Sequence, residues 1–358
     1  MIKCIKNTAV IFITTAAVYF CIIYPQSVGN AVKEAVDRCL CVIVPSMFIF
    51  MCITVFISFT GIHSLLAVPF EFISEKLFRL PKEGFAIFLL SMISGYPTGI
   101  KLVTENYRNG NLTSEQASVM NNFCCCAGPA FISGTVAEFL YPDSNAGLLI
   151  FISVVSGNLV TALLLAVKLK KPYKTVKSSV SLKKNQLIPS VRTASSAMLQ
   201  MCIMIAAFGG FTCILKLSGA ISLLSCFISQ ITGIDALTSE NIVLTFLEIS
   251  NIVNLPPMQL NLFPLTAFLV SFGGLCVHMQ ISALAESNFS AVKFFLSRTF
   301  SAAVSGITAF FLMTFFNTDI SCNVNIKAVS QSNYSPLPSF MLIVMICILI
   351  GAFEKNKK

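Results

Sequence analysis

The chain has 358 residues, of which 56% are hydrophobic and only 11% charged, and its mean hydropathy is +0.83. A soluble protein carries about 25% charged residues, so the composition excludes an ordinary soluble domain and indicates a polytopic membrane protein. The net charge of +9 comes from lysines in short loops beside apolar runs. This is the positive-inside pattern of membrane proteins, so we expect a lipid bilayer, and no nucleic acid, as a partner.

Apolar runs that can cross a membrane recur along the chain, and each span needs about 20 residues. Segments 62–80 and 220–233 are amphipathic or short, which suits the membrane surface. Segments 83–100 and 241–255 are apolar but interrupted. The sequence therefore predicts an all-α polytopic membrane fold with about eight transmembrane helices and two re-entrant or broken hairpins. The predicted spans are 7–24, 39–60, 123–140, 145–167, 195–217, 262–285, 294–315 and 338–353.

Lysines predict the orientation of the spans. Lys3 and Lys6 predict a cytoplasmic N-terminus. The lysine-rich segment 168–184 predicts that the middle loop is cytoplasmic, and the lysine-rich segment 354–358 predicts the same for the C-terminus. An even number of crossings must then separate residue 6 from residue 168. Treating 83–100 as re-entrant satisfies this condition, whereas counting it as a full span does not.

The two halves of the chain share one order of elements, namely span, amphipathic helix, broken hairpin, glycine-interrupted span and span. The first set begins outside and the second inside, so the repeats have inverted topology, which is the sequence signature of a secondary transporter. The alternative is that any polytopic protein can be cut into loosely similar halves. The predicted divisions are 1–38 (N-terminal helix and connecting segment), 39–167 (first repeat), 168–190 (basic cytoplasmic linker), 191–315 (second, inverted repeat) and 316–358 (loop and C-terminal helix).

In the first half, the segment SGYPTG at 94–99 interrupts an apolar run. Glycine and proline break a helix, and non-helical backbone survives at membrane depth only where it is buried in protein or lines a polar cavity. A substrate-binding hairpin is favoured over a packing kink, because three hydroxyl side chains surround the break. Gly128 and Pro129 predict a second break inside 123–140, with Asn122 one or two turns before it, and the free N–H groups of the following half-helix favour polar or anionic groups.

In the second half, Glu248 lies among apolar residues, where a carboxylate is costly and usually faces a cavity, pairs with a cation or carries a proton. We assign it to ion coupling, with H⁺ or Na⁺ as the coupling ion; the alternative is a solvated loop residue. Gly273 and Gly274 loosen the span at 262–285. His278 and Gln280 are rare polar residues on that span, and a helix–helix hydrogen bond by His278 is the alternative to a site role.

Enzymatic activity is not expected, because the chain has no hydrolase, kinase, Rossmann or P-loop signature and no convincing nucleophile–base pair. Its 14 cysteines show no regular metal-ligand spacing. Three of them, at 124–126, point around more than half a helical turn and are best explained by packing. We therefore expect no metal and no cofactor.

Four motifs resemble a known family: VPSMFIF at 44–50, SGYPTGIKL at 94–102, AGPAFISGTV at 127–136 and FGGLCVHMQ at 272–280. They are similar to the YlbJ-type sporulation integral membrane proteins of endospore-forming bacteria, which carry a nucleoside-recognition, or Gate, domain. The resemblance implies Gate-like repeats related to the cores of concentrative nucleoside transporters, a role in sporulation, and a location in the bacterial cell membrane or the forespore membrane. The chain departs from the family in having cysteine where an asparagine usually precedes the Gly-Pro pair, and Asn251 where a glycine is usual.

The resemblance implies dipicolinate as the solute, whereas the name of the domain suggests nucleosides. The leading expectation is a transporter or facilitator of a small polar or anionic organic solute. A nucleoside-type transporter and a non-transporting scaffold of the spore envelope are the alternatives, and copies of the chain or other sporulation membrane proteins remain open as partners. The candidate substrate-binding residues are Ser94, Gly95, Tyr96, Pro97, Thr98, Gly99, Asn122, Gly128, Pro129, Ser250, Asn251, Gly273, Gly274, His278 and Gln280, with Glu248 for ion coupling.

Overall fold

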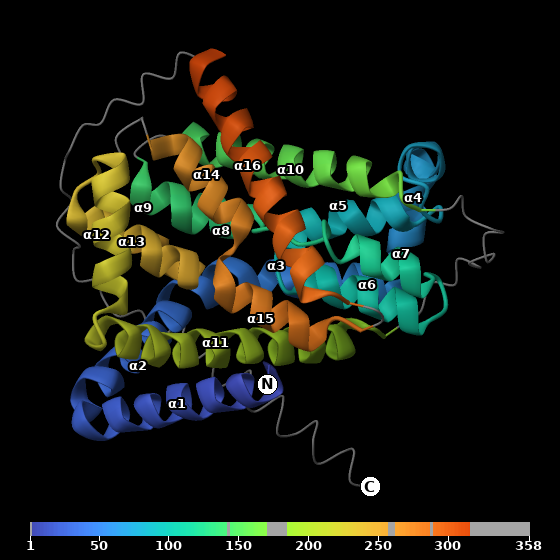
Figure 1. The fold of residues 1–358 in the computed structure, drawn as a ribbon. Coiled ribbons are helices and arrows are strands. Elements are labelled where there is room, and N and C mark those ends of the chain that lie inside the picture. Colours follow the sequence, from blue (N-terminus) through green and yellow to red (C-terminus); the bar gives the residue numbers. More distant parts are fainter. Residues whose placement is uncertain (1, 142–143, 170–184, 257–261, 287–288, 316–358) are drawn as a thin grey trace, which may run out of the picture.

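The computed structural model describes residues 2–141, 144–169, 185–256, 262–286 and 289–315 (Figure 1). Within these ranges every regular element is a helix, and there is no β-strand. The predicted all-α fold is therefore confirmed.

A long helix dominates the N-terminal part. It starts at Pro25, a residue suited to the first turn of a helix, and continues through a π-helical turn to Thr60, a total of 36 residues. It is much longer than the predicted span 39–60, and the predicted division after residue 38 falls inside it. The elements here are α1 (Ile2–Ile23), α2 (Pro25–Arg38), the π-turn (Cys39–Ile43) and α3 (Val44–Thr60).

The first predicted hairpin is present as two helices separated at Gly95–Pro97. The second of them ends at Arg108 rather than at residue 100, because its polar residues lie on one side of an amphipathic helix whose other side is buried. Thr113 and Gln116 form the reciprocal hydrogen bonds of a capping box at the start of the next helix. These elements are α4 (Ile62–Ala67), a 3₁₀-turn (Val68–Phe70), a π-turn (Ile73–Leu77), α5 (Gly84–Ser94), α6 (Thr98–Arg108) and α7 (Ser114–Met120).

The break predicted at Gly128 and Pro129 is present, but the predicted span 123–140 does not cross a membrane as a helix. Residues 121–128 are not helical, and the helix that follows, Pro129–Leu140, is too short to cross a membrane. Gly128 has the extended conformation (φ −70°, ψ 158°) that a following proline imposes, so the helix begins only at Pro129. Its parts are α8 (Pro129–Phe131), a π-turn (Ile132–Ala137) and α9 (Glu138–Leu140), and α10 (Ser144–Ala166) comes next.

The second half contains a sharply bent helix pair, α12 and α13, whose axes meet at 118°. A 3₁₀-turn follows α13 directly after Glu248, and the span predicted at 262–285 is broken at Gly273, which has φ +85°. The elements are α11 (Leu187–Leu217), α12 (Ala220–Thr232), α13 (Ala236–Leu247), the 3₁₀-turn (Ile249–Asn254), α14 (Phe263–Phe272), α15 (Gly274–Leu284) and α16 (Ala291–Phe315).

Five described helices are long and apolar enough to cross a membrane, or six if α12 and α13 count as one broken span. A polytopic membrane protein is therefore confirmed, while the predicted number of eight spans stays a prediction. The span predicted at 338–353 and most of the basic loop at 168–184 lie outside the described residues. The inverted repeat and the cytoplasmic termini thus stay predictions. The five helices are Pro25–Thr60, Asn145–Ala166, Leu187–Leu217, Phe263–Leu284 and Ala291–Phe315.

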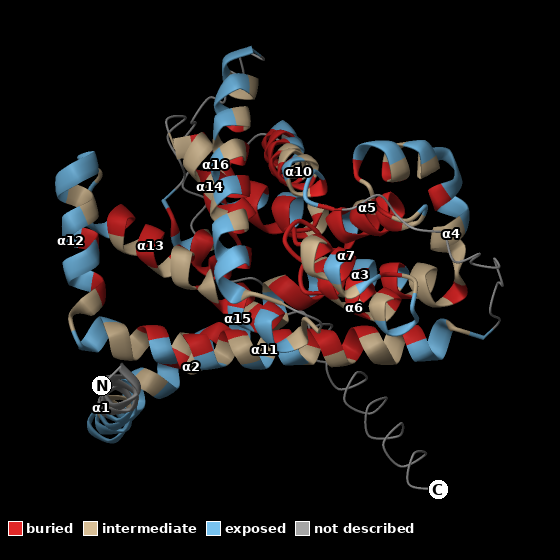
Figure 2. Cartoon of the chain, turned by 45° about the vertical axis from the view of Figure 1, so that its right-hand side comes forward, coloured by how far each residue is buried: buried red, intermediate tan, exposed pale blue. Residues whose placement is uncertain are grey.

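The interrupted helices lie at the centre of the molecule, and longer helices surround them. Helix α16 packs on α10 and α14, and α11 packs on α2 and α3. Figure 2 shows buried residues concentrated along α5, α10 and α15, whereas α12 and α16 present exposed outer faces. Many of the exposed residues on these outer helices are large and apolar, as a surface in contact with lipid requires.

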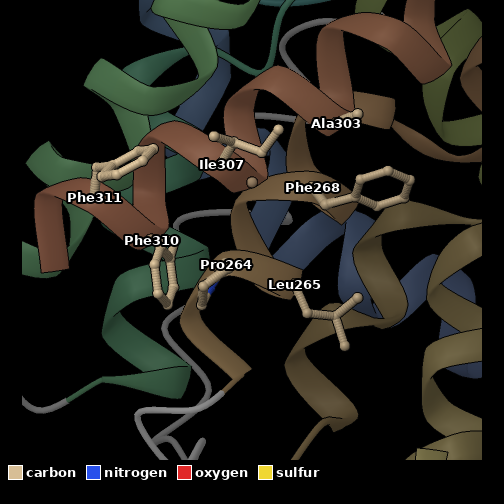
Figure 3. A pocket seen from close by; sticks show the side chains of 8 residues that line it. Pro264, Leu265, Phe268, Ala303, Ile307, Phe310 and Phe311 are labelled. Carbon is tan, nitrogen blue, oxygen red and sulfur yellow. The ribbon is translucent and has the colours of Figure 1, made fainter. Parts of the chain in front are cut away.

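A hollow on this outer surface lies between α14 and α16 (Figure 3). It is lined by apolar side chains from both helices, and Ile307, Phe310 and Phe311 are more than half exposed. The hollow has no polar group that could orient a polar solute. It is a feature of the apolar exterior and not a candidate for the solute site.

Candidate functional site

The two breaks of the first half lie against each other. The backbone N–H of Tyr96 donates to the carbonyl oxygen of Cys126 at 2.8 Å. A Cβ atom added to Gly95 would lie 2.9 Å from the backbone nitrogen of Gly128, and one added to Gly99 would lie 2.3 Å from the carbonyl oxygen of Cys124. Glycine is needed at these positions because the two backbones approach too closely for any side chain.

The break in the second half reaches the same place. A Cβ atom added to Gly273 would lie 3.4 Å from the ring of Tyr96, and one added to Gly274 would lie 3.0 Å from the backbone nitrogen of Ile249. The tip of the first hairpin, the break between α14 and α15, and the turn after Glu248 therefore converge. We call this region the crossing. Its segments are 94–99, 124–129, 248–250 and 273–274.

A small cavity lies beside the crossing and has room for about one water molecule. Four predicted site residues line it, namely Tyr96, Glu248, Ser250 and Gln280. The rest of its wall is apolar and was not predicted, because a single apolar residue gives no sequence signal that distinguishes a cavity wall from the core. These residues are Ile43, Met47, Phe131, Met201, Ile205, Ile249 and Val277.

Glu248 is buried, with 2% of its surface exposed. Its carboxylate accepts a hydrogen bond from the Ser250 backbone N–H at 3.0 Å and another from the Ser250 hydroxyl. Within the described ranges no cation lies within ion-pair distance of it, although Arg38 attracts it electrostatically from the end of α2. Glu248 is thus a buried acid at the crossing held by neutral donors, and Arg38 is a neighbouring charge that the sequence reasoning missed.

Several buried polar atoms of the predicted site have no hydrogen-bond partner among the residues that the structure describes. They are the hydroxyls of Tyr96 and Thr98, Nε2 of His278 and Oε1 of Gln280. More than 90% of buried polar groups in folded proteins are hydrogen-bonded, so a group of unpartnered atoms suggests a ligand or water. Nδ1 of His278 lies 2.7 Å from the carbonyl oxygen of Gly274, which orients the ring within its own helix.

Other predicted residues have partners that fix the backbone. Asn122 donates to the Ser118 carbonyl oxygen at 2.7 Å at the end of α7, and Asn251 donates to the Glu248 carbonyl oxygen at 3.1 Å. The Ser94 hydroxyl meets only its neighbour's carbonyl oxygen, at 3.5 Å. Pro97 follows a cis peptide bond, and Pro129 begins α8. These residues shape the crossing, and a direct role in substrate contact stays a prediction.

Arg298 of α16 is a functional candidate that the sequence reasoning missed. It is buried, with 1% of its surface exposed, and it donates to Oδ1 of Asn158 at 2.5 Å and to the Ser271 carbonyl oxygen. The guanidinium lies near Tyr96 and Cys126, two residues of the crossing. No local motif marks this arginine, and only the tertiary fold brings it to the break after α14.

Comparison with known proteins supports the same class of molecule. The chain is 22% identical over 321 residues to the sporulation integral membrane protein YlbJ of Bacillus subtilis (strain 168), covering 79% of this chain and 77% of that protein. The resemblance to YlbJ is confirmed. No family model matches the chain, and no solved structure matches it. The similarity to YlbJ and the apolar helices together support a multi-pass membrane location, while the Gate-domain relationship stays a prediction.

Proposed function

We propose that this YlbJ-like protein is a sporulation-associated membrane transporter or facilitator of a small polar or anionic organic solute, with dipicolinate favoured over a nucleoside. The observation that carries the proposal is the crossing. Interrupted helices of both halves of the chain meet around a cavity lined by Tyr96, Glu248 and Gln280. Discontinuous helices that meet in this way are the usual substrate and ion sites of secondary transporters.

The narrow cavity indicates how the cycle would proceed. A space for about one water molecule cannot hold an aromatic solute, so the described conformation is occluded. The ring of Tyr96 packs closely on Gly273, because glycine has no side chain at this contact. Binding of the solute requires the hairpin tip at Tyr96 to move away from Gly273. Glu248 would carry a proton between the open and closed states, because protonation removes the cost of burying its charge.

Equilibrium binding to the purified protein tests the proposal. Radiolabelled dipicolinate and radiolabelled uridine are each bound to the protein in detergent, and unlabelled solute is added in excess as the competitor. We expect saturable, competable binding of dipicolinate, because the site presents hydrogen-bond donors and lies near Arg298. If only uridine binds saturably, the proposed solute is a nucleoside and not dipicolinate. If neither compound binds, the proposed solute site is contradicted.

Tyr96→Phe is expected to weaken solute binding by about fivefold while leaving thermal stability unchanged. The Tyr96 hydroxyl is buried and has no hydrogen-bond partner in the described part of the chain. Its removal therefore costs the folded protein none of these bonds, whereas a bound solute loses a hydrogen bond worth about 1 kcal/mol. Binding isotherms and thermal unfolding midpoints measure the two effects.

Tyr141→Phe is the matched control. The Tyr141 hydroxyl lies 2.8 Å from Oγ1 of Thr266, and Tyr141 does not line the cavity. This variant should lower stability by about 1 kcal/mol without changing solute affinity. The opposite pattern, with Tyr96→Phe destabilised and binding normally, would show that the Tyr96 hydroxyl has a structural role.

A non-transporting scaffold of the spore envelope is the second candidate, and the small size of the cavity favours it. A scaffold needs the fold but no solute, so cavity variants that remain folded should support sporulation as well as the wild type does. Spore yield and spore dipicolinate content of a strain carrying Tyr96→Phe or Glu248→Gln distinguish the two functions. A transporter loses dipicolinate content in these variants, and a scaffold retains it.

A further inference from the structure

Arg298 is held by a network that joins three helices. The guanidinium donates from Nη1 to Oδ1 of Asn158 in α10 and from Nη2 to the backbone carbonyl oxygen of Ser271 in α14. The Ser301 hydroxyl donates to the same Asn158 oxygen at 3.3 Å, and the Ser305 hydroxyl donates to Oγ of Ser271 at 3.0 Å. Oxygen atoms of α10 and α14 therefore accept hydrogen bonds from the guanidinium of α16, and two hydroxyls of α16 bind the same two partner residues.

All of these acceptors are neutral. Among the described residues, Arg298 takes part in no ion pair, and its Nε atom has no hydrogen-bond partner. A buried arginine normally pairs with a carboxylate, because an isolated charge is costly inside a protein and within a membrane. A cation held by a neutral backbone carbonyl oxygen and a neutral side-chain amide oxygen resembles instead a bound metal cation with its oxygen ligands.

The position of the charge within the fold supports this comparison. Ser271 lies in the last turn of α14, directly before the break at Gly273. The carboxyl end of a helix carries partial negative charge, and the ends of broken helices are where secondary transporters coordinate a coupling Na⁺ or H⁺. In this chain the guanidinium of α16 occupies such an end.

We propose that the Arg298 guanidinium is a built-in cation that fills the position of a coupling ion at the end of α14, so that this site takes no Na⁺. It is tethered to α16, and it stabilises the break beside the crossing permanently, without an ion that must bind and leave. The consequence for transport, which is independence from Na⁺, rests on the proposed function. The ionic role of Arg298 does not depend on it.

Two substitutions of similar length isolate the charge. Arg298→Lys keeps a cation in the cage, and Arg298→Met keeps the volume without the charge. Thermal unfolding of the purified proteins should place Arg298→Lys close to the wild type and Arg298→Met lower by at least about 5 °C. Equal stability of the two variants would overturn the proposal. Failure of Arg298→Met alone to yield folded protein would support it, and failure of both variants would count against it.

A titration then tests the vacated cage. Arg298→Ala leaves the oxygen ligands in place, so low-millimolar methylguanidinium should raise its unfolding temperature in a saturable manner, as expected for a ligand that binds the folded state. The wild type and Arg108→Ala serve as controls, since Arg108 is exposed and pairs with Glu286. An increase no larger than in these controls would contradict a cation cage. If Arg298→Ala does not fold, the unfolding temperatures of Arg298→Lys and Arg298→Met decide the role of the charge.

Uptake into proteoliposomes separates this proposal from the proposed function. Replacing external Na⁺ by K⁺ should change dipicolinate uptake by the wild type by less than about twofold, since no coupling Na⁺ is needed at α14. A strict requirement for Na⁺ would contradict the inference. Complete absence of uptake in both salts would remove the transport function and leave the stability comparison to decide the role of Arg298.

Discussion

Gly95→Ala is expected to lower the free energy of unfolding by about 2–4 kcal/mol. Gly95 has φ +75° and ψ 174°, a conformation essentially restricted to glycine. In addition, an added Cβ would lie 2.9 Å from the backbone nitrogen of Gly128 and 3.3 Å from its Cα. Both effects push the two breaks of the first half apart. Thermal unfolding of the purified protein in detergent measures the change.

Gly29→Ala is the control for this substitution. Gly29 lies inside α2, and nothing lies within 4 Å of a Cβ added to it. Alanine in an open helical position stabilises by about 0.5–1 kcal/mol relative to glycine, so this variant should unfold at the same temperature as the wild type or a higher one. If Gly95→Ala is as stable as Gly29→Ala, the result would contradict close contact between the backbones at Gly95 and Gly128.

Glu248→Gln is expected to reduce solute uptake by about tenfold or more, because an amide cannot carry a proton. Stability should change little, since the glutamine oxygen can accept the hydrogen bond from the Ser250 N–H, and the glutamine amide group can donate to the Ser250 hydroxyl, which accepts as well as donates. Remaining uptake should also lose the pH dependence of the wild type. Initial rates in proteoliposomes across a range of external pH, together with unfolding midpoints, measure these effects.

The matched substitution is Glu286→Gln. Glu286 is an exposed acid paired with Arg108 at the surface, where one ion pair contributes little. Its uptake should equal that of the wild type at every pH. A Glu248→Gln protein that is folded and transports at the wild-type rate would exclude both proton coupling and a direct role of this acid.

The breaks could be predicted from the sequence because their cause is local. Gly95, Pro97 and Gly273 interrupt helices through their own backbone geometry, and the structure places a break at each of them. Glu248 stood out as a carboxyl among apolar residues, and its burial follows from the same composition. The sequence pattern also predicts that the hairpin tip and the turn after Glu248 belong to comparable parts of two repeats, and this relationship stays a prediction.

The remaining features depend on tertiary contacts. The apolar run at 123–140 looked long enough to span, yet Pro129 starts its helix late and the Cys126 carbonyl oxygen bonds to Tyr96 instead of continuing a helix. Arg298 could not be assigned to a site from the sequence, because its partner Asn158 lies 140 residues away. The apolar cavity wall likewise comes from segments far apart in the sequence, so periodicity could not bring them together.

Uptake by the reconstituted wild-type protein is the most direct test of a solute pathway through the crossing. Proteoliposomes and protein-free liposomes are compared for radiolabelled dipicolinate and uridine, with folding verified by thermal unfolding. We expect saturable uptake of dipicolinate that is lost with Glu248→Gln and retained with Glu286→Gln. Folded wild-type protein that gives no saturable uptake of either solute would contradict it.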